Sequence, residues 1–458
     1  MAHAASRRPR KRCRTRLAGV LLVLGLAGTL PAHAQLQLPG RLPTVPGVPD
    51  LTRRAQEVRP VDTLTSAIPL QDLRRVMVRN LLQQQRDTLE ADPAGEPVVR
   101  GELLLASPTP ALIDAALANG YRVLRTDMLQ GLDERIVVLA PPPGTPLAAA
   151  AARLRGIDPG LTIDFNHVYT RSGSVDDPAP AAQPPPPSAP PEPRPASPSR
   201  RVGLIDGGID TRHPALLDTP IRPWGCAGRS IPSPHGTAVA SLLVGRAAEF
   251  VGSAPRGTRL FAADIYCDAP TGGASDQLLQ AMAWMALERV PVINVSLVGP
   301  ANRLLERVVA AMYARGHLIV AAVGNDGPAA PPLYPASYPG VIGVTGVGPS
   351  NRVLPEAAQG PQVAFAAPGA ELAVARAGER GYVVARGTSF AAPAVAGLLS
   401  ESLAEPDTES ARLATRQWQQ RAIDLGAPGR DDVYGWGLLD WIGRASPQRL
   451  HARRDAAF

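Results

Sequence analysis

Lysine, cysteine and long apolar runs are scarce in this chain of 458 residues. Lys11 is the only lysine, and there are three cysteines. The apolar run Leu17–Leu30 is shorter than the roughly 20 residues that a helix needs to cross a bilayer. No later run reaches that length either. We therefore predict no transmembrane segment.

The formal net charge of +7 has a single origin. Residues 1–34 hold seven arginines and lysines and no acidic residue. Removing those seven from the 47 basic residues leaves 40, which equals the number of acidic residues. A chain that is neutral beyond its first segment has no phosphate-binding footprint, so we predict no nucleic-acid partner.

Residues 1–34 have the pattern of a secretory signal peptide. A basic cluster precedes the apolar run, and Ala32-His-Ala34 has the small-residue spacing of a cleavage site before Gln35. We predict a secreted or periplasmic protein. In such an oxidising compartment Cys226 and Cys267 form either a disulfide or two free buried thiols, and the sequence leaves both open.

The length suggests two or three domains. Composition and periodicity divide the chain into a signal peptide at 1–34, an N-terminal extension at 35–95, a small α+β domain at 96–172, a proline-rich linker at 173–200, a main domain at 201–446 and a tail at 447–458. Proline crowds residues 178–198, which therefore cannot bury a core. This segment is either a semi-rigid tether or a spacer with no further role.

The region before the linker is predicted to contain one helix and then a βαββαβ unit. The helix covers Leu70–Leu89. The unit consists of strands at Val98–Ala106, Tyr121–Thr126, Arg135–Leu139 and Leu161–Tyr169, with helices at Pro110–Asn119 and Pro146–Leu154.

The main domain alternates apolar strands with helices. We predict strands at Val202–Asp206, Arg259–Ile265, Val290–Val295, Leu318–Val323, Val341–Val344 and Val363–Ala366, and helices at Thr237–Val244, Asp276–Glu288 and Leu304–Arg315. Strands without polar alternation indicate a parallel sheet covered on both faces. Functional groups then gather at the carboxyl ends of the strands, where Asp206 and Asn325 fall.

Ser389 is the candidate nucleophile. It begins the small and apolar stretch Gly387–Gly397, which we interpret as a buried helix with its free N–H groups beside the hydroxyl. Taken alone, Ser389 is equally well an ordinary helix cap, Asp206 a turn former and His235 a structural histidine. Their joint occurrence favours acyl-transfer chemistry.

Four segments together resemble the subtilisin-like serine proteases. They are Val202–Asp210 (VGLIDGGID), His235–Ala240 (HGTAVA), Ala321–Gly327 (AAVGNDG) and Gly387–Gly397, in that family's order. The resemblance implies a parallel sheet with helices on both faces. It also implies a triad of Asp206, His235 and Ser389, with Asn325 as the oxyanion donor.

The resemblance further implies that Ser296, Leu297 and Val298 pair with the substrate backbone. It implies that the α+β domain is a propeptide that inhibits the active site until it is cut away. Three features depart from the family. Gly207 replaces Ser or Thr beside the acid, Leu297 and Val298 replace glycines, and Leu243–Val251 offers only Glu249 to calcium. We predict no cofactor and no metal site.

The sequence therefore predicts a secreted serine endopeptidase that acts on polypeptides as a monomer and is made as an autoinhibited precursor. The alternative is a catalytically inactive relative that binds other proteins, although a binding module needs none of the four site residues. An esterase of the α/β-hydrolase type is excluded, because it needs Gly-x-Ser-x-Gly and the order Ser, Asp, His.

Overall fold

The computed structural model describes residues 70–175, 200–229, 231–247, 250–269 and 271–441. The predicted signal peptide, residues 35–69, the proline-rich stretch and the tail lie outside the described residues. All described elements belong to one compact unit. Among the described residues, no helix has the length and apolar character needed to cross a membrane.

The front domain, residues 70–167, is a small antiparallel α+β fold. Its elements are α2 (Leu70–Gln84), β1 (Leu89–Ala91), β2 (Pro97–Ala106), α3 (Pro110–Ala118), β3 (Arg122–Leu129), β4 (Glu134–Ala140), α4 (Leu147–Ile157) and β5 (Thr162–His167). The sheet order is β1-β2-β4-β3, and β5 also pairs with β2. The predicted βαββαβ order is confirmed.

Local sequence explains the ends of α3. The side chain of Thr109 caps its first turn by accepting the N–H of Leu112, and Pro110 occupies the first helical position. Gly120, with φ of +81°, follows its end. The predicted end of the first helix was wrong, because α2 stops at Gln84 and Leu89 begins β1.

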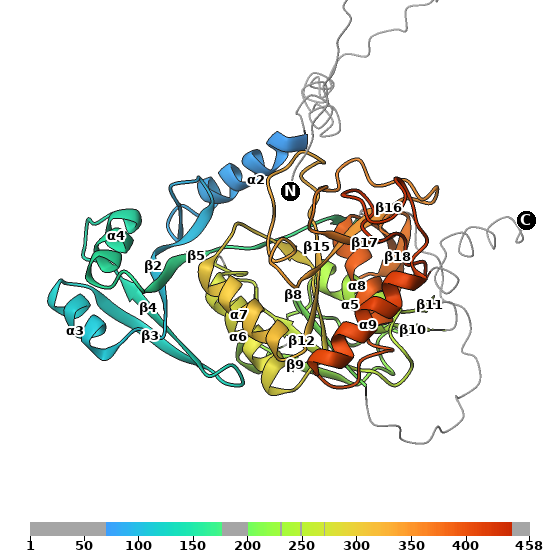
Figure 1. The fold of residues 1–458 in the computed structure, drawn as a ribbon, viewed down its shortest axis with the longest axis horizontal. Helices are drawn as coiled ribbons and strands as arrows, with labels where there is room; N and C mark the ends of the chain where they lie inside the picture. The colour runs from blue at the N-terminus through green and yellow to red at the C-terminus, as the bar shows by residue number, and fades with distance from the viewer. Residues whose placement is uncertain (1–69, 176–199, 230, 248–249, 270, 442–458) are drawn as a thin grey trace, which may run out of the picture. The chain divides into compact units, whose positions relative to one another are not determined.

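The main domain, residues 200–441, is built on a seven-stranded parallel sheet with the order β17-β16-β15-β13-β8-β12-β9 (Figure 1). The strands are β8 (Arg201–Asp206), β9 (Ile221–Trp224), β12 (Arg259–Asp264), β13 (Val292–Val295), β15 (Leu318–Ala322), β16 (Ile342–Val347) and β17 (Val363–Pro368). Six of them match predicted strands. The edge strand β9 was missed.

Helices cover both faces of this sheet, as predicted. The helices are α5 (Pro234–Val244), α6 (Ser275–Leu287), α7 (Arg303–Ala314), α8 (Thr388–Leu399) and α9 (Thr408–Arg421). Leu204 on β8 faces a core that includes α5 and α8, whereas its neighbour Ile205 faces a core that includes α6 and α7. Burial on both faces explains why the strands lack polar alternation.

The other elements of the main domain are short. They are η1 (Cys226–Gly228), the pair β10 (Arg246–Ala247) and β11 (Phe250–Val251), β14 (Leu297–Val298), and the hairpin of β18 (Leu372–Ala375) and β19 (Tyr382–Arg386).

The chain leaving β5 runs along the main domain. Strand β6 (Thr170–Arg171) pairs antiparallel with β14, and β7 (Ser174–Val175) pairs antiparallel with β19. We call residues 170–175 the blocking segment. Its two ends are therefore held by strands from different parts of the main domain.

Candidate active site

Asp206 and His235 form a buried pair at the carboxyl ends of the central strands of the parallel sheet. Asp206 is the last residue of β8, and His235 is the second residue of α5, whose N-terminus is capped by Ser233. The Nδ1 atom of His235 lies 3.0 and 2.9 Å from the two carboxylate oxygens of Asp206. The backbone N–H of Gly207 also donates to Asp206, at 2.6 Å. These contacts fix the carboxylate and the ring.

Ser389 lies in the first turn of α8, directly after Gly387 and Thr388, and the φ of Gly387 is +136°. Pro393 has no N–H, so the carbonyl of Ser389 lacks its usual helical partner. The hydroxyl of Ser296 donates to that carbonyl at 2.9 Å, and the Ser389 hydroxyl donates to the carbonyl of Ser296 at 3.2 Å. This reciprocal pair ties the serine to the residue just before β14.

Asn325 follows β15, and its amide group lies between the first turn of α8 and the blocking segment. Its Oδ1 accepts the backbone N–H of Thr388 at 3.0 Å. Its Nδ2 donates to the hydroxyl of Ser172, in the blocking segment, at 2.6 Å. Because Oδ1 is occupied by a backbone donor, the NH₂ group is left to face the site.

The blocking segment contacts His235 and Asn325 and lies against the backbone of Gly387. The carbonyl oxygen of Ser172 lies 3.3 Å from Nε2 of His235. A Cβ on Gly387 would lie 2.7 Å from the Cα of Gly173, so backbone approaches backbone directly. Ser389 is fully buried in this covered site.

The predicted substrate-binding residues pair with the same segment. Leu297 is paired with Arg171 and Val298 with Thr170, and continuing this register places Ser172 opposite Ser296. Tyr169, just before the segment, is completely buried, and its hydroxyl donates to the carbonyl of Pro300 at 2.8 Å. Residues 169–172 therefore run as an extended chain alongside residues 296–300.

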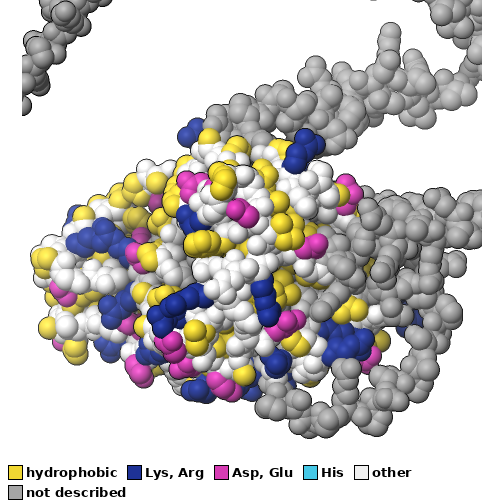
Figure 2. Space-filling view, turned by 45° about the vertical axis from the view of Figure 1, so that its right-hand side comes forward, with side chains coloured by type: hydrophobic (Ala, Val, Ile, Leu, Met, Phe, Trp, Pro, Cys, Tyr) yellow, Lys and Arg dark blue, Asp and Glu magenta, His cyan; other side chains and the backbone are white. Residues whose placement is uncertain are grey.

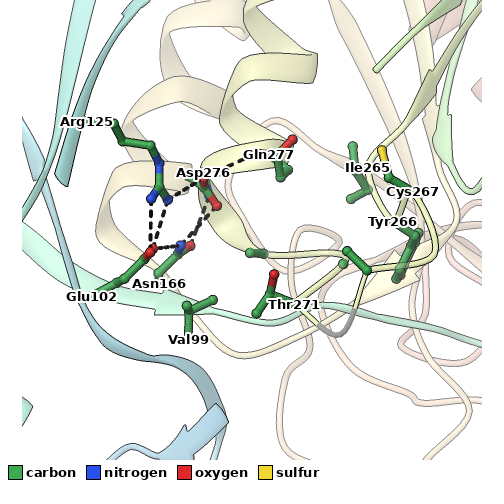
Figure 3. Close-up of a pocket in the computed structure, with 13 residues that line it drawn as sticks. Val99, Glu102, Arg125, Asn166, Ile265, Tyr266, Cys267, Thr271, Asp276 and Gln277 are labelled. Atoms are coloured by element: carbon green, nitrogen blue, oxygen red, sulfur yellow. Dashed lines mark hydrogen bonds and ion pairs between the residues drawn. The ribbon is translucent and has the colours of Figure 1, made fainter. Parts of the chain in front are cut away.

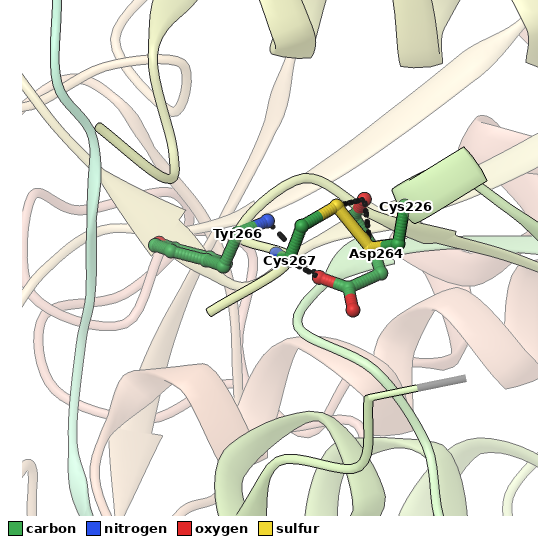
Figure 4. Close-up of a disulfide and its surroundings, with 4 residues drawn as sticks. All are labelled: Cys226, Asp264, Tyr266 and Cys267. Carbon is green, nitrogen blue, oxygen red and sulfur yellow. Dashed lines mark hydrogen bonds between the residues drawn. A yellow bond between two sulfur atoms is a disulfide. The ribbon is translucent and has the colours of Figure 1, made fainter. Parts of the chain in front are cut away.

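Cys226 and Cys267 form a disulfide with an S–S distance of 2.10 Å (Figure 4). Asp264 lies beside it, and its Oδ1 accepts the N–H groups of Tyr266 and Cys267, both at 3.0 Å. The two sulfurs and a carboxylate oxygen of Asp264 lie within 4.8 Å of one another. Sulfurs bonded to each other offer no thiolate, so this cluster does not fit a metal site. Glu249, the one calcium ligand considered from sequence, lies outside the described residues.

A polar cluster joins the front domain to α6 (Figure 3). Arg125 donates to both oxygens of Glu102, at 2.9 and 2.8 Å, and to Asp276 at 2.6 Å. The amide of Asn166 donates to the same two acids and accepts the backbone N–H of Asp276. Burial alone would lower the pKa of Arg125, but the two carboxylates outweigh it and raise that pKa.

Sequence reasoning missed two contributors to this site and one contact of a third. Ser296 was predicted to pair with the substrate backbone, but its hydroxyl bond to the Ser389 carbonyl was not predicted. A proline four residues after the serine was the available signal. Asp264 and Ser172 carried no signal of their own, because their importance depends on neighbours distant in sequence.

Comparison with known structures establishes the class of fold. The crystal structure of fervidolysin from Fervidobacterium pennivorans, a keratinolytic enzyme related to subtilisin, matches with a TM-score of 0.61 and 20% identity over 77% of this chain and 61% of that one. Residues 200–458 make up less than three fifths of the chain, so the match extends beyond the main domain. The fold is subtilisin-like.

The sequence also matches a family. The model of the subtilase family matches residues 199–437, more than half of the chain, which therefore belongs to that family. The minor extracellular protease Epr of Bacillus subtilis is 29% identical over 48% of this chain and 34% of its own length. Subtilisin E of the same organism is 29% identical over 52% of this chain and 64% of its own. The chain thus spans between a third and two thirds of these relatives.

Proposed function

We propose that this chain is a serine endopeptidase made as a precursor, with its active site covered by its own blocking segment. Three contacts support the proposal: Asp206 is bonded to Nδ1 of His235, Nε2 of His235 lies 3.3 Å from the Ser172 carbonyl oxygen, and the Asn325 amide is bonded to the Ser172 hydroxyl. A catalytically inactive binding protein has no need for that arrangement.

The proposed reaction is acyl transfer. The Oγ atom of Ser389 bonds to the carbonyl carbon of the peptide bond to be cut, and His235 accepts the proton of that hydroxyl. Asp206 stabilises the resulting imidazolium. The Nδ2 group of Asn325 and the N–H of Ser389 donate to the developing oxyanion. His235 then protonates the leaving nitrogen, and water hydrolyses the acyl-enzyme by the same steps.

The described arrangement is a resting state of this site. The Ser389 hydroxyl is bonded to Ser296 and the Asn325 amide to the Ser172 side chain. Attack requires Ser389 to turn about χ1 toward Nε2 of His235, and the carbonyl of Ser172 to replace its hydroxyl at Asn325. We propose Ser172–Gly173 as the bond cut during maturation, because the Ser172 carbonyl lies 3.3 Å from Nε2 of His235 and the Ser172 side chain is bonded to Asn325.

Export is part of the proposal. Its supports are the signal-like pattern of residues 1–34, the disulfide, and the extracellular location in the name of the relative Epr. On the face drawn in Figure 2, basic and acidic side chains are interspersed over the described residues. This face therefore lacks the continuous basic patch that nucleic-acid binding needs.

The test is production of the full-length chain with and without Ser389→Ala. The unmodified chain should yield a fragment that starts at Gly173 by mass spectrometry, and the variant should stay uncut. Ser350→Ala, which changes an exposed turn serine, should process normally. Normal processing of the Ser389 variant would refute the role of that serine. An unmodified chain that neither cuts itself nor reacts with a serine-directed phosphonate would favour the binding protein.

A further inference from the structure

Arg171 precedes the residue whose carbonyl faces His235, and its side chain has a defined environment. The centre of its guanidinium lies 4.0 Å from the centroid of the Tyr266 ring, which is cation–π geometry. The residue is exposed overall, so this contact holds one end of a side chain that solvent also reaches.

Gly207 makes room for that guanidinium. A Cβ on Gly207 would lie 2.9 Å from Nη2 of Arg171 and 2.5 Å from the hydroxyl of Ser233. A side chain at this position would therefore compete with the arginine for the same space. The φ of Gly207 is not in the left-handed region, so space and not backbone conformation accounts for the glycine.

Asp264 supplies negative charge at the same turn. Strand register pairs it with Asp206, and its Oδ2 would lie 2.8 Å from a Cβ on Gly208, the next residue of the turn. The residue is 8% exposed. Burial raises its pKa, and the Tyr266 and Cys267 N–H groups and the charge of Arg171 partly oppose that rise. The arginine and the carboxylate therefore interact electrostatically.

We propose that Gly207, Asp264 and Tyr266 form a subsite that selects arginine as the second residue on the amino side of the cleaved bond. The inference rests on the proposed function, because it assigns a side-chain preference to that reaction. Arg171 occupies the subsite in the precursor. In the mature enzyme an arginine of a substrate would take its place.

The test uses the self-processed wild-type enzyme and eight-residue peptides with the sequence of residues 168–175. One peptide keeps arginine at the position of Arg171, and matched peptides carry glutamine or glutamate there. The arginine peptide should have a kcat/KM about tenfold above the glutamine peptide, the size expected for one cation–π contact and a partly screened charge. The ratio should fall as salt rises from about 0.05 to about 0.5 M, a range that spans about a threefold change in Debye length.

Substitutions in the proposed subsite test which residues cause the preference for arginine. Asp264→Asn keeps an oxygen for the two N–H groups and should reduce the arginine-to-glutamine ratio severalfold. Asp268→Asn, which removes an exposed carboxylate from the same loop, should leave the ratio unchanged. If Asp264→Asn does not fold, Tyr266→Leu should lower the ratio and Tyr266→Phe, which keeps the ring, should preserve it.

The outcomes separate this inference from the function on which it rests. Equal kcat/KM for the arginine and glutamine peptides, both cleaved at Ser389, overturns the subsite and leaves the endopeptidase intact. An enzyme that cleaves none of the peptides and does not process itself overturns both. A ratio that survives both Asp264→Asn and Tyr266→Leu shows that the selectivity comes from other residues, and the assignment fails.

Discussion

Replacing Arg125 by methionine should destabilise the chain by about 2 kcal/mol. Arg125 is bonded to both Glu102 and Asp276, whose side chains are 15% and 5% exposed. Breaking a buried ion pair by removing one partner costs about 3–5 kcal/mol. The Arg125 side chain is 33% exposed, so solvent screening reduces that loss to about 2 kcal/mol.

The assay is urea unfolding of the full-length Ser389→Ala chain, in which no cleavage can intervene. Arg122→Met changes an exposed arginine on the same strand and should alter the free energy of unfolding by less than about 0.5 kcal/mol. Adding Asp276→Asn to Arg125→Met should recover part of the loss, because one of the two uncompensated charges is then removed.

A destabilisation by Arg125→Met no larger than that by Arg122→Met would refute the reasoning. No recovery on adding Asp276→Asn would refute it as well.

Two further predictions concern stability. Joint replacement of Cys226 and Cys267 by serine should lower the free energy of unfolding by about 4 kcal/mol, because their sequence separation of 41 closes a long loop. Non-reducing peptide mapping that finds two free thiols would contradict the disulfide. Burial lowers the pKa values of His213 and His317, so the unfolded chain binds more protons and stability should fall as pH drops below about 6.5. In urea unfolding at several pH values, the free energy of unfolding of His317→Gln should fall less at low pH than that of the unmodified chain. An equal dependence on pH in the two proteins would contradict the contribution of His317.

The sequence was sufficient to predict most of the parallel sheet and the order of the front domain. Six main strands are apolar at successive positions, as a strand buried on both faces requires. The edge strand β9 was not predictable in the same way, since it contains Pro223 and its middle residues are exposed. The end of α2 was also missed, because Leu89 continued the helical spacing but belongs to β1.

The candidate site was predictable as residue types and not as contacts. Motif order supplied Asp206, His235, Asn325 and Ser389, whose catalytic roles stay a proposal. Nothing local indicates that residues 170–175 lie across them, because strand pairing between distant segments leaves no periodic mark.

The two-ended attachment of the blocking segment has a kinetic consequence. A peptide tethered to its own binding site experiences an effective concentration in the millimolar range, so dilute external peptides compete poorly with it. Cutting after Ser172 would leave the downstream half held by two residue pairs of β7 and β19, whereas the upstream half keeps the whole front domain as an anchor. The lifetime of the blocked state would then be set by dissociation of that anchor, on a timescale separate from bond cleavage.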